Sequence, residues 1–105
     1  MQPPTEEEVL RIIYLAIDEL NPQLPPERRL EKSPGTALFG SGGRLDSLGL
    51  VSLIVAIEQA VEDQLAVTVV LADEKAMSQR SSPFQTVGAL AGYVRARVEE
   101  RAGGA

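Results

Sequence analysis

The sequence predicts a small all-α domain. Three stretches place apolar residues at helical spacing, and the one strand-like run, residues 67–71, has no second run with which to pair. The 105 residues are enough for one domain with a modest core, and aliphatic side chains must supply it because the chain has only two Phe, two Tyr and no Trp. We expect a single domain over residues 1–105, with residues 1–4 and 102–105 as disordered tails.

Composition narrows the possible functions. The net charge of −5 disfavours nucleic acid and anionic membranes as partners. The chain has no Cys and no His, so it contains no disulfide, no thiolate or imidazole metal ligand and no Ser-His-Asp triad. No apolar run is long enough to insert into a membrane, and the N-terminus is acidic where a signal peptide would be basic. These features predict a soluble cytoplasmic protein without a metal site.

The first helix is predicted over Glu6–Leu20. Thr5 and Glu8 have the spacing of a capping box, and three successive glutamates suit the positive end of the helix dipole. Asn21-Pro22 ends the periodic pattern. The expected buried stripe consists of Val9, Ile12, Ile13, Ala16, Ile17 and Leu20.

A long loop is predicted from Asn21 to Leu45, because prolines and then glycines interrupt every periodic pattern there. Leu30, Leu38 and Phe39 are expected to attach it to the core. Loops of this length in compact domains are uncommon unless they serve a function. A nucleotide-binding loop is improbable, since the glycines are followed by no Gly-Lys-Ser/Thr sequence and preceded by no strand.

The second helix is predicted from Ser47 to about Asp63, roughly 25 Å long. Asp46 is a favoured N-cap residue, so Ser47 falls at the first helical position. Its hydroxyl then lies at the positive end of the helix dipole, where an attached phosphate would be stabilised. The expected inward face is Val51, Ile54, Ile57, Glu58 and Val61, whereas Leu48 and Val55 lie on another side.

The remaining chain is predicted to contain a connector and two further helices. Val67–Leu71 is read as an extended connector whose valines enter the core, because a lone strand cannot satisfy its backbone. Asp73 is expected to cap a short helix to about Gln79, with Met77 facing inward.

Thr86 is expected to cap the last helix, from Val87 to about Arg101. Gly88 and Gly92 are expected to let another helix approach closely. The predicted buried stripe is Val87, Leu90, Val94 and Val98.

One motif is more specific than this architecture. Leu45-Asp46-Ser47-Leu48, within Leu-Phe-Gly-x-Gly-Gly-x-Leu-Asp-Ser-Leu-Gly, resembles the attachment motif of acyl carrier proteins. The resemblance implies a small four-helix bundle, with three longer helices and one short helix after a long first loop. It also implies that Ser47 carries 4′-phosphopantetheine, delivered from coenzyme A, and that Asp46 and Leu48 flank the attachment site.

As a carrier the chain would not be an enzyme. The resemblance implies a monomer that shuttles thioester-bound intermediates between other proteins, namely a phosphopantetheinyl transferase and acyl- or aminoacyl-loading and transferring enzymes. Leu-Asp-Ser-Leu-Gly is also similar to stand-alone carriers of aminoacyl groups, including the D-alanyl type. The sequence does not choose among fatty acyl, polyketide and aminoacyl cargo, nor does it identify the pathway.

Charge predicts where partners would dock. The segment from Leu45 to Glu74 has six acidic residues and no basic residue. Basic partner surfaces would meet Glu58 and Glu62, and Leu48 and Val55 would supply apolar contact. Fatty-acid carriers commonly have further acids just after the serine, where this chain has Gly49 and Ser52.

Two other interpretations stay open. Asp46 and Ser47 also suit an ordinary helix start, in which case the chain is an acidic helical interaction module that is not pantetheinylated. A hydrolase using Ser47 would need Lys32 or Lys75 as its base, and neither has motif spacing.

Overall fold

The computed structural model describes residues 4–40, 42–71 and 83–103. These ranges contain three α-helices and two 3-10 turns: α1 (Glu6–Leu20), η1 (Asn21–Gln23), η2 (Pro26–Arg28), α2 (Ser47–Leu65) and α4 (Val87–Gly103). No β-strand occurs within them, which confirms the all-α prediction for this part of the chain. The short helix predicted from Asp73 to Gln79, including Met77, lies outside the described residues.

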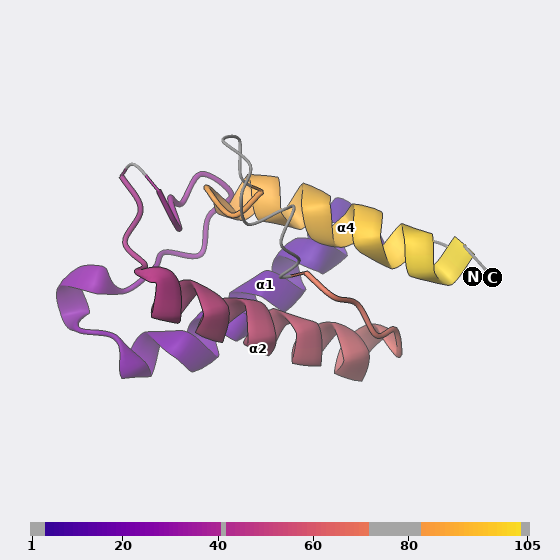
Figure 1. The fold of residues 1–105 in the computed structure, drawn as a ribbon, viewed down its shortest axis with the longest axis horizontal. Helices are drawn as coiled ribbons and strands as arrows, with labels where there is room; N and C mark the ends of the chain where they lie inside the picture. The colour runs from indigo at the N-terminus through magenta and orange to yellow at the C-terminus, as the bar shows by residue number, and fades with distance from the viewer. Residues whose placement is uncertain (1–3, 41, 72–82, 104–105) are drawn as a thin grey trace.

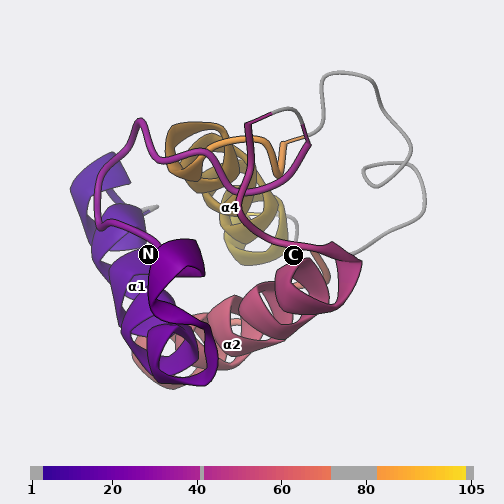
Figure 2. The same ribbon diagram turned by 90° about the vertical axis from the view of Figure 1, so that its left-hand side faces the viewer.

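Helix α1 packs against both α2 and α4, so it is the central element of the core (Figures 1 and 2). Its predicted stripe is confirmed, because all six residues from Val9 to Leu20 in that pattern are buried. The stripe predicted on α4 is also buried, with Ala91 added to it. Among the described residues, no helix is long and apolar enough to cross a membrane.

The three predicted helix starts that lie within the described residues are confirmed. Thr5 Oγ1 accepts a hydrogen bond from the Glu8 amide at 3.1 Å, and the Glu8 carboxylate accepts from the Thr5 amide at 3.4 Å. Thr86 Oγ1 accepts from the Ala89 amide at 3.1 Å. Asp46 caps α2 in the same way. Each bond satisfies an amide that the first helical turn leaves without a backbone acceptor.

The inward face of α2 differs from the prediction: Val51 is exposed, Glu58 is only half-buried, and Leu50 and Leu53 are buried in addition. The buried residues of α2 are Leu50, Leu53, Ile54, Ile57 and Val61, whereas the Val51 side chain is 42% exposed. Apolar residues occupy most positions from 48 to 57, so their spacing defines no single face there. Packing against α1 selects the face instead, and it leaves Val51 in solvent.

The predicted helix ends are short by two residues. Helix α2 ends at Leu65, beyond Asp63, where Ala66 adopts the left-handed conformation (φ 56°) and donates its amide to the Glu62 carbonyl at 3.0 Å. Helix α4 extends to Gly103, beyond Arg101. Pro4, which the sequence places in a tail, is buried.

The two glycines of α4 do not provide a close helix contact. A Cβ at Gly88 would lie 3.1 Å from the carbonyl oxygen of Pro34, so Gly88 admits the long loop, not a helix. A Cβ at Gly92 would meet no atom of the described residues within 4 Å. Among the described residues, neither glycine therefore admits another helix, contrary to the prediction.

The connector after α2 is neither helix nor strand, and only part of it enters the core. Val69 and Leu71 are buried, whereas Val70 is 58% exposed, an alternation that agrees with the predicted extended chain. The Leu71 amide donates to Glu58 Oε2 at 2.8 Å, and the Leu71 carbonyl accepts from Tyr93 Oη at 3.1 Å. Leu71 is thus attached to both α2 and α4.

Candidate functional site

The long loop leads from the end of α1 to the start of α2 and passes the start of α4 on the way (Figure 1). Asn21 closes its first part, because the side-chain amide donates to the Leu30 carbonyl at 2.9 Å and accepts from the Leu30 amide at 2.8 Å. Leu30 and Leu38 are buried and Phe39 is half-buried, which confirms their predicted role as anchors.

A glycine turn brings the chain back to the start of α2. Gly40 and Gly42 have φ values of 91° and 80°, which favour glycine. A Cβ at Gly43 would lie 2.6 Å from the Phe39 amide nitrogen, so only glycine fits there without movement of the backbone. The Leu45 amide donates to the Leu38 carbonyl at 2.9 Å, which fixes the residue before Asp46.

The same loop is bonded to the start of α4. The Leu38 amide donates to the Gln85 carbonyl at 2.7 Å, and the Val87 amide donates to the Thr36 carbonyl at 3.0 Å. These bonds flank the bridge between Ala37 and Thr86. Backbone hydrogen bonds therefore join the start of α4 to the loop, and the loop to the residue before Asp46 at the start of α2.

Asp46 fixes the first turn of α2. Its Oδ1 accepts from the Gly49 amide at 2.7 Å, and its carbonyl accepts from the Leu50 amide at 2.9 Å. A Cβ at Gly49 would lie 3.2 Å from this Oδ1 and 3.3 Å from Leu45 Cδ2. The absence of a side chain at Gly49 thus leaves space for the cap itself, a role that the sequence does not reveal.

Ser47 is the first residue of α2, and it is exposed. Among the residues that the structure describes, none forms a hydrogen bond with its hydroxyl. The first turn of α2 contains no acidic residue, so the field of the helix terminus is opposed only by the Asp46 cap. The position combines an accessible oxygen with an environment that favours an attached anion.

Exposed apolar side chains continue from Ser47 along α2. Leu48 is 75% exposed and Val55 is 44% exposed, which confirms that both face away from the core. Val51 joins them, because residues three and four apart share a helix face. We call Leu48, Val51 and Val55 the apolar stripe of α2.

The two predicted docking acids differ in environment. Glu62 is exposed, whereas Glu58 is half-buried and its Oε2 accepts the hydrogen bond from Leu71. Glu58 therefore has a structural contact that the sequence does not show. Of the two carboxylates, only that of Glu62 belongs to a fully exposed residue.

The lysines give little support to a hydrolase. Lys32 Nζ forms a salt bridge with Asp18 Oδ1 of α1 at 3.2 Å. Lys75 lies outside the described residues. The search of those residues for groups of three or more His, Cys, Asp or Glu side chains able to hold a metal found none.

Comparison of the chain with protein-family models, with curated proteins and with solved structures gave no match in any of the three.

Proposed function

We propose that the protein is a carrier of the acyl-carrier type, with the four-helix architecture of that family. It would hold an acyl or related intermediate as a thioester on 4′-phosphopantetheine attached to Ser47, and pass it between cytoplasmic enzymes. The observation that carries this proposal is the exposed Ser47 hydroxyl, free of hydrogen bonds to the described residues, at the capped N-terminus of α2.

The attachment reaction suits these residues. The Ser47 oxygen forms a bond to the phosphorus next to pantetheine in coenzyme A, the pyrophosphate bond breaks, and adenosine bisphosphate leaves while the serine proton is removed. An isolated serine is a poor nucleophile, so a transferase with bound magnesium must supply the base and the charge stabilisation. The carrier contributes an accessible oxygen and free helix amides near the new phosphodiester. The pantetheine thiol then supplies the thioester chemistry.

A docking surface next to Ser47 supports the same function. A shuttle must bind several enzymes briefly, which favours a small interface with apolar contact and charge attraction. The apolar stripe of α2 would provide the contact, and the exposed Glu62 carboxylate would attract basic partner residues. No catalytic group is required of the carrier itself.

Intact mass spectrometry tests the proposal. The protein is incubated with coenzyme A, magnesium and a broad-specificity phosphopantetheinyl transferase. We expect a gain of one phosphopantetheine group for the wild type and for the control Ser52→Ala, whose serine is also exposed on α2. Ser47→Ala should show no gain and should keep its helicity. Failure of the wild type to react would instead support the unmodified acidic interaction module.

A further inference from the structure

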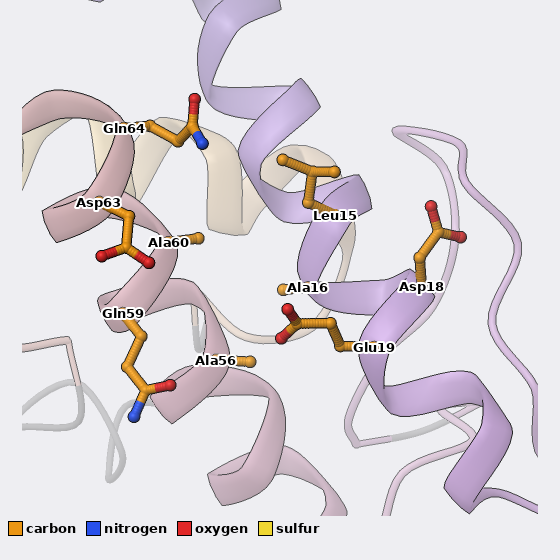
Figure 3. A pocket seen from close by; sticks show the side chains of 9 residues that line it. All are labelled: Leu15, Ala16, Asp18, Glu19, Ala56, Gln59, Ala60, Asp63 and Gln64. Carbon is orange, nitrogen blue, oxygen red and sulfur yellow. The ribbon is translucent and has the colours of Figure 1, made fainter.

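A groove runs between α1 and α2 (Figure 3). It opens on the side of these two helices that faces away from α4. Its volume is about 300 Å³. Ala16 of α1 and Ala56 and Ala60 of α2 form its floor, where the two helices face each other with small side chains (Figure 3). Leu15 stands at the edge of this floor and is 45% exposed. The groove therefore offers an apolar surface that a partner's side chain would remove from water.

The groove continues past Leu15. A second depression of about 110 Å³ is lined by Ile12, Leu15 and Leu65, and its polar lining is Glu8, Arg11 and Gln64. The surface thus extends along α1 from Glu8 to Glu19, roughly 16 Å at the rise of an α-helix. A partner helix of about three turns would match that length. A helix that lies in a groove between two others is a common arrangement in helix packing and in peptide recognition. It is longer than one small polar ligand requires.

The walls of the first depression are acidic, whereas in the second depression the positive charge of Arg11 offsets that of Glu8. Glu19 on α1 and Asp63 on α2 are exposed, and within the described residues neither carboxylate has a hydrogen-bond or salt-bridge partner. Asp18 differs, because Lys32 neutralises it. In Figure 3 the Glu19 side chain reaches toward the α2 side of the gap. Two uncompensated carboxylates on opposite walls favour cations on the occupant.

This charge disfavours the other classes of occupant. A symmetric pair of copies would bring the same two carboxylates against themselves, in a chain of net charge −5. Anionic lipid and nucleic acid would be repelled in the same way. A cationic helix remains, and both its shape and its charge fit the groove.

We propose that the α1–α2 groove is a docking site for an amphipathic helix of a partner protein. An apolar side chain of that helix would rest on the alanine floor beside Leu15, and Lys or Arg side chains one turn away on each side would face Glu19 and Asp63. The groove occupies a face of α2 other than the apolar stripe, and it does not include Ser47. The carrier could therefore remain attached to one protein while its Ser47 end engages another.

A synthetic helical peptide with a leucine face flanked by lysines serves as the probe. It is titrated into the full-length ¹⁵N-labelled protein, and amide chemical shifts are followed. We expect saturable changes concentrated at residues 15–19 and 56–64. Glu19→Lys and Asp63→Lys should each raise Kd about fivefold, the effect of losing one favourable exposed charge pair. The matched control Glu27→Lys, an exposed acid outside the groove, should change Kd less than about twofold.

The floor is tested separately from the charges. Ala60→Trp should fill the groove and raise Kd about tenfold, because the apolar contact is lost. Ala96→Trp places the same side chain on an exposed site of α4 and should leave Kd unchanged. Circular dichroism of each variant establishes that the fold persists, and the two charge variants remain decisive if Ala60→Trp does not fold.

Several results would overturn the proposal. These are no saturable binding, shift changes centred on Leu48, Val51 and Val55, or equal losses for Glu19→Lys and Glu27→Lys, which would show only an effect of net charge. Two further results would assign the groove to another occupant. Concentration-dependent shifts of groove amides without peptide would indicate a second copy, and the same shifts with vesicles of anionic phospholipid would indicate a membrane.

Discussion

Asp46 and Ser47 are neighbours with separate physical roles. The Asp46 carboxylate faces the helix and accepts the Gly49 amide, whereas the Ser47 hydroxyl faces solvent. Stability therefore depends on the first residue, and any modification chemistry depends on the second. This separation allows a group to be attached to Ser47 without loss of the cap that holds α2 in place.

A pair of substitutions measures that separation. Asp46→Ala should lower the free energy of unfolding by about 1 kcal/mol, because an orphan amide loses its acceptor. Ser47→Ala should change it by less than about 0.5 kcal/mol, as is usual for an exposed side chain without partners. Urea denaturation followed by circular dichroism gives both values. An equal loss for the two variants would mean that Ser47 is part of the capping structure.

At the scale of the element, α2 ends in a conformation that its residue disfavours. Ala66 has a φ of 56°, a value at which a Cβ crowds the following carbonyl. Glycine is the residue usually found at this position of a helix end. The chain therefore retains a local strain just before the connector to Leu71.

Ala66→Gly should raise the free energy of unfolding by about 0.5–1 kcal/mol, because relief of this strain exceeds the entropy lost by glycine. The same change at Ala96, an exposed position inside α4, should lower it by about 1 kcal/mol. Urea midpoints of the two variants should thus move in opposite directions. A midpoint that falls for Ala66→Gly would contradict the left-handed cap.

The exposed faces of α2 give a kinetic prediction. Leu48→Ala should raise the transferase KM about fivefold at any salt concentration, because it removes apolar contact area. Glu62→Lys should raise KM mainly at low ionic strength, where exposed charges are least screened. Glu58→Lys is a poor probe of docking, since it would also break the contact with Leu71.

KM is measured for both variants at two ionic strengths, with helicity checked by circular dichroism. An unchanged KM for Leu48→Ala, with the whole effect residing in Glu62, would reject apolar docking. The carrier proposal itself would survive that result.

Across the whole molecule, the long loop links α2 to α4, two helices that do not pack directly against each other within the described residues. Asn21 holds both backbone groups of Leu30, and the Leu38 region bonds to Gln85 next to α4. The loop therefore determines where α2 begins relative to α4. A rigid position for Ser47 depends on residues far from it in sequence.

Asn21→Ala should lower the free energy of unfolding by about 2 kcal/mol, because two half-buried backbone groups at Leu30 lose their partners. Gln23→Ala, an exposed neighbour, should change it by less than about 0.5 kcal/mol. Thermal or urea unfolding measures the difference. Near-equal values would show that water replaces the Asn21 contacts without cost.

The sequence predicts the parts of this structure that depend on neighbouring residues. Thr5, Asp46 and Thr86 are identifiable as caps because each bonds an amide only a turn away. Contacts between distant segments have no such signature. The pairing of Glu58 with Leu71 and the approach of Pro34 to Gly88 arise only when the helices pack.

In the candidate site too, features that depend on neighbouring residues are predicted, and features that depend on distant segments are not. Ser47 and Leu48 are recognised from a contiguous motif, and their exposure agrees with that prediction. The exposure of Val51 is missed because apolar residues occupy most positions from 48 to 57, so the sequence does not show which face of α2 is buried. The groove between α1 and α2 is missed because its floor combines Ala16 with alanines some forty positions away, and no single stretch contains both.

Locating the attached group tests the central claim most directly. The protein is treated with coenzyme A and transferase and then digested, and the fragments are sequenced by tandem mass spectrometry. We predict that the phosphopantetheine mass is found on Ser47 and on no other serine of the chain. A modified fragment that assigns the group to Ser52 or to any other residue, or an unmodified Ser47 after exhaustive reaction, would contradict the account.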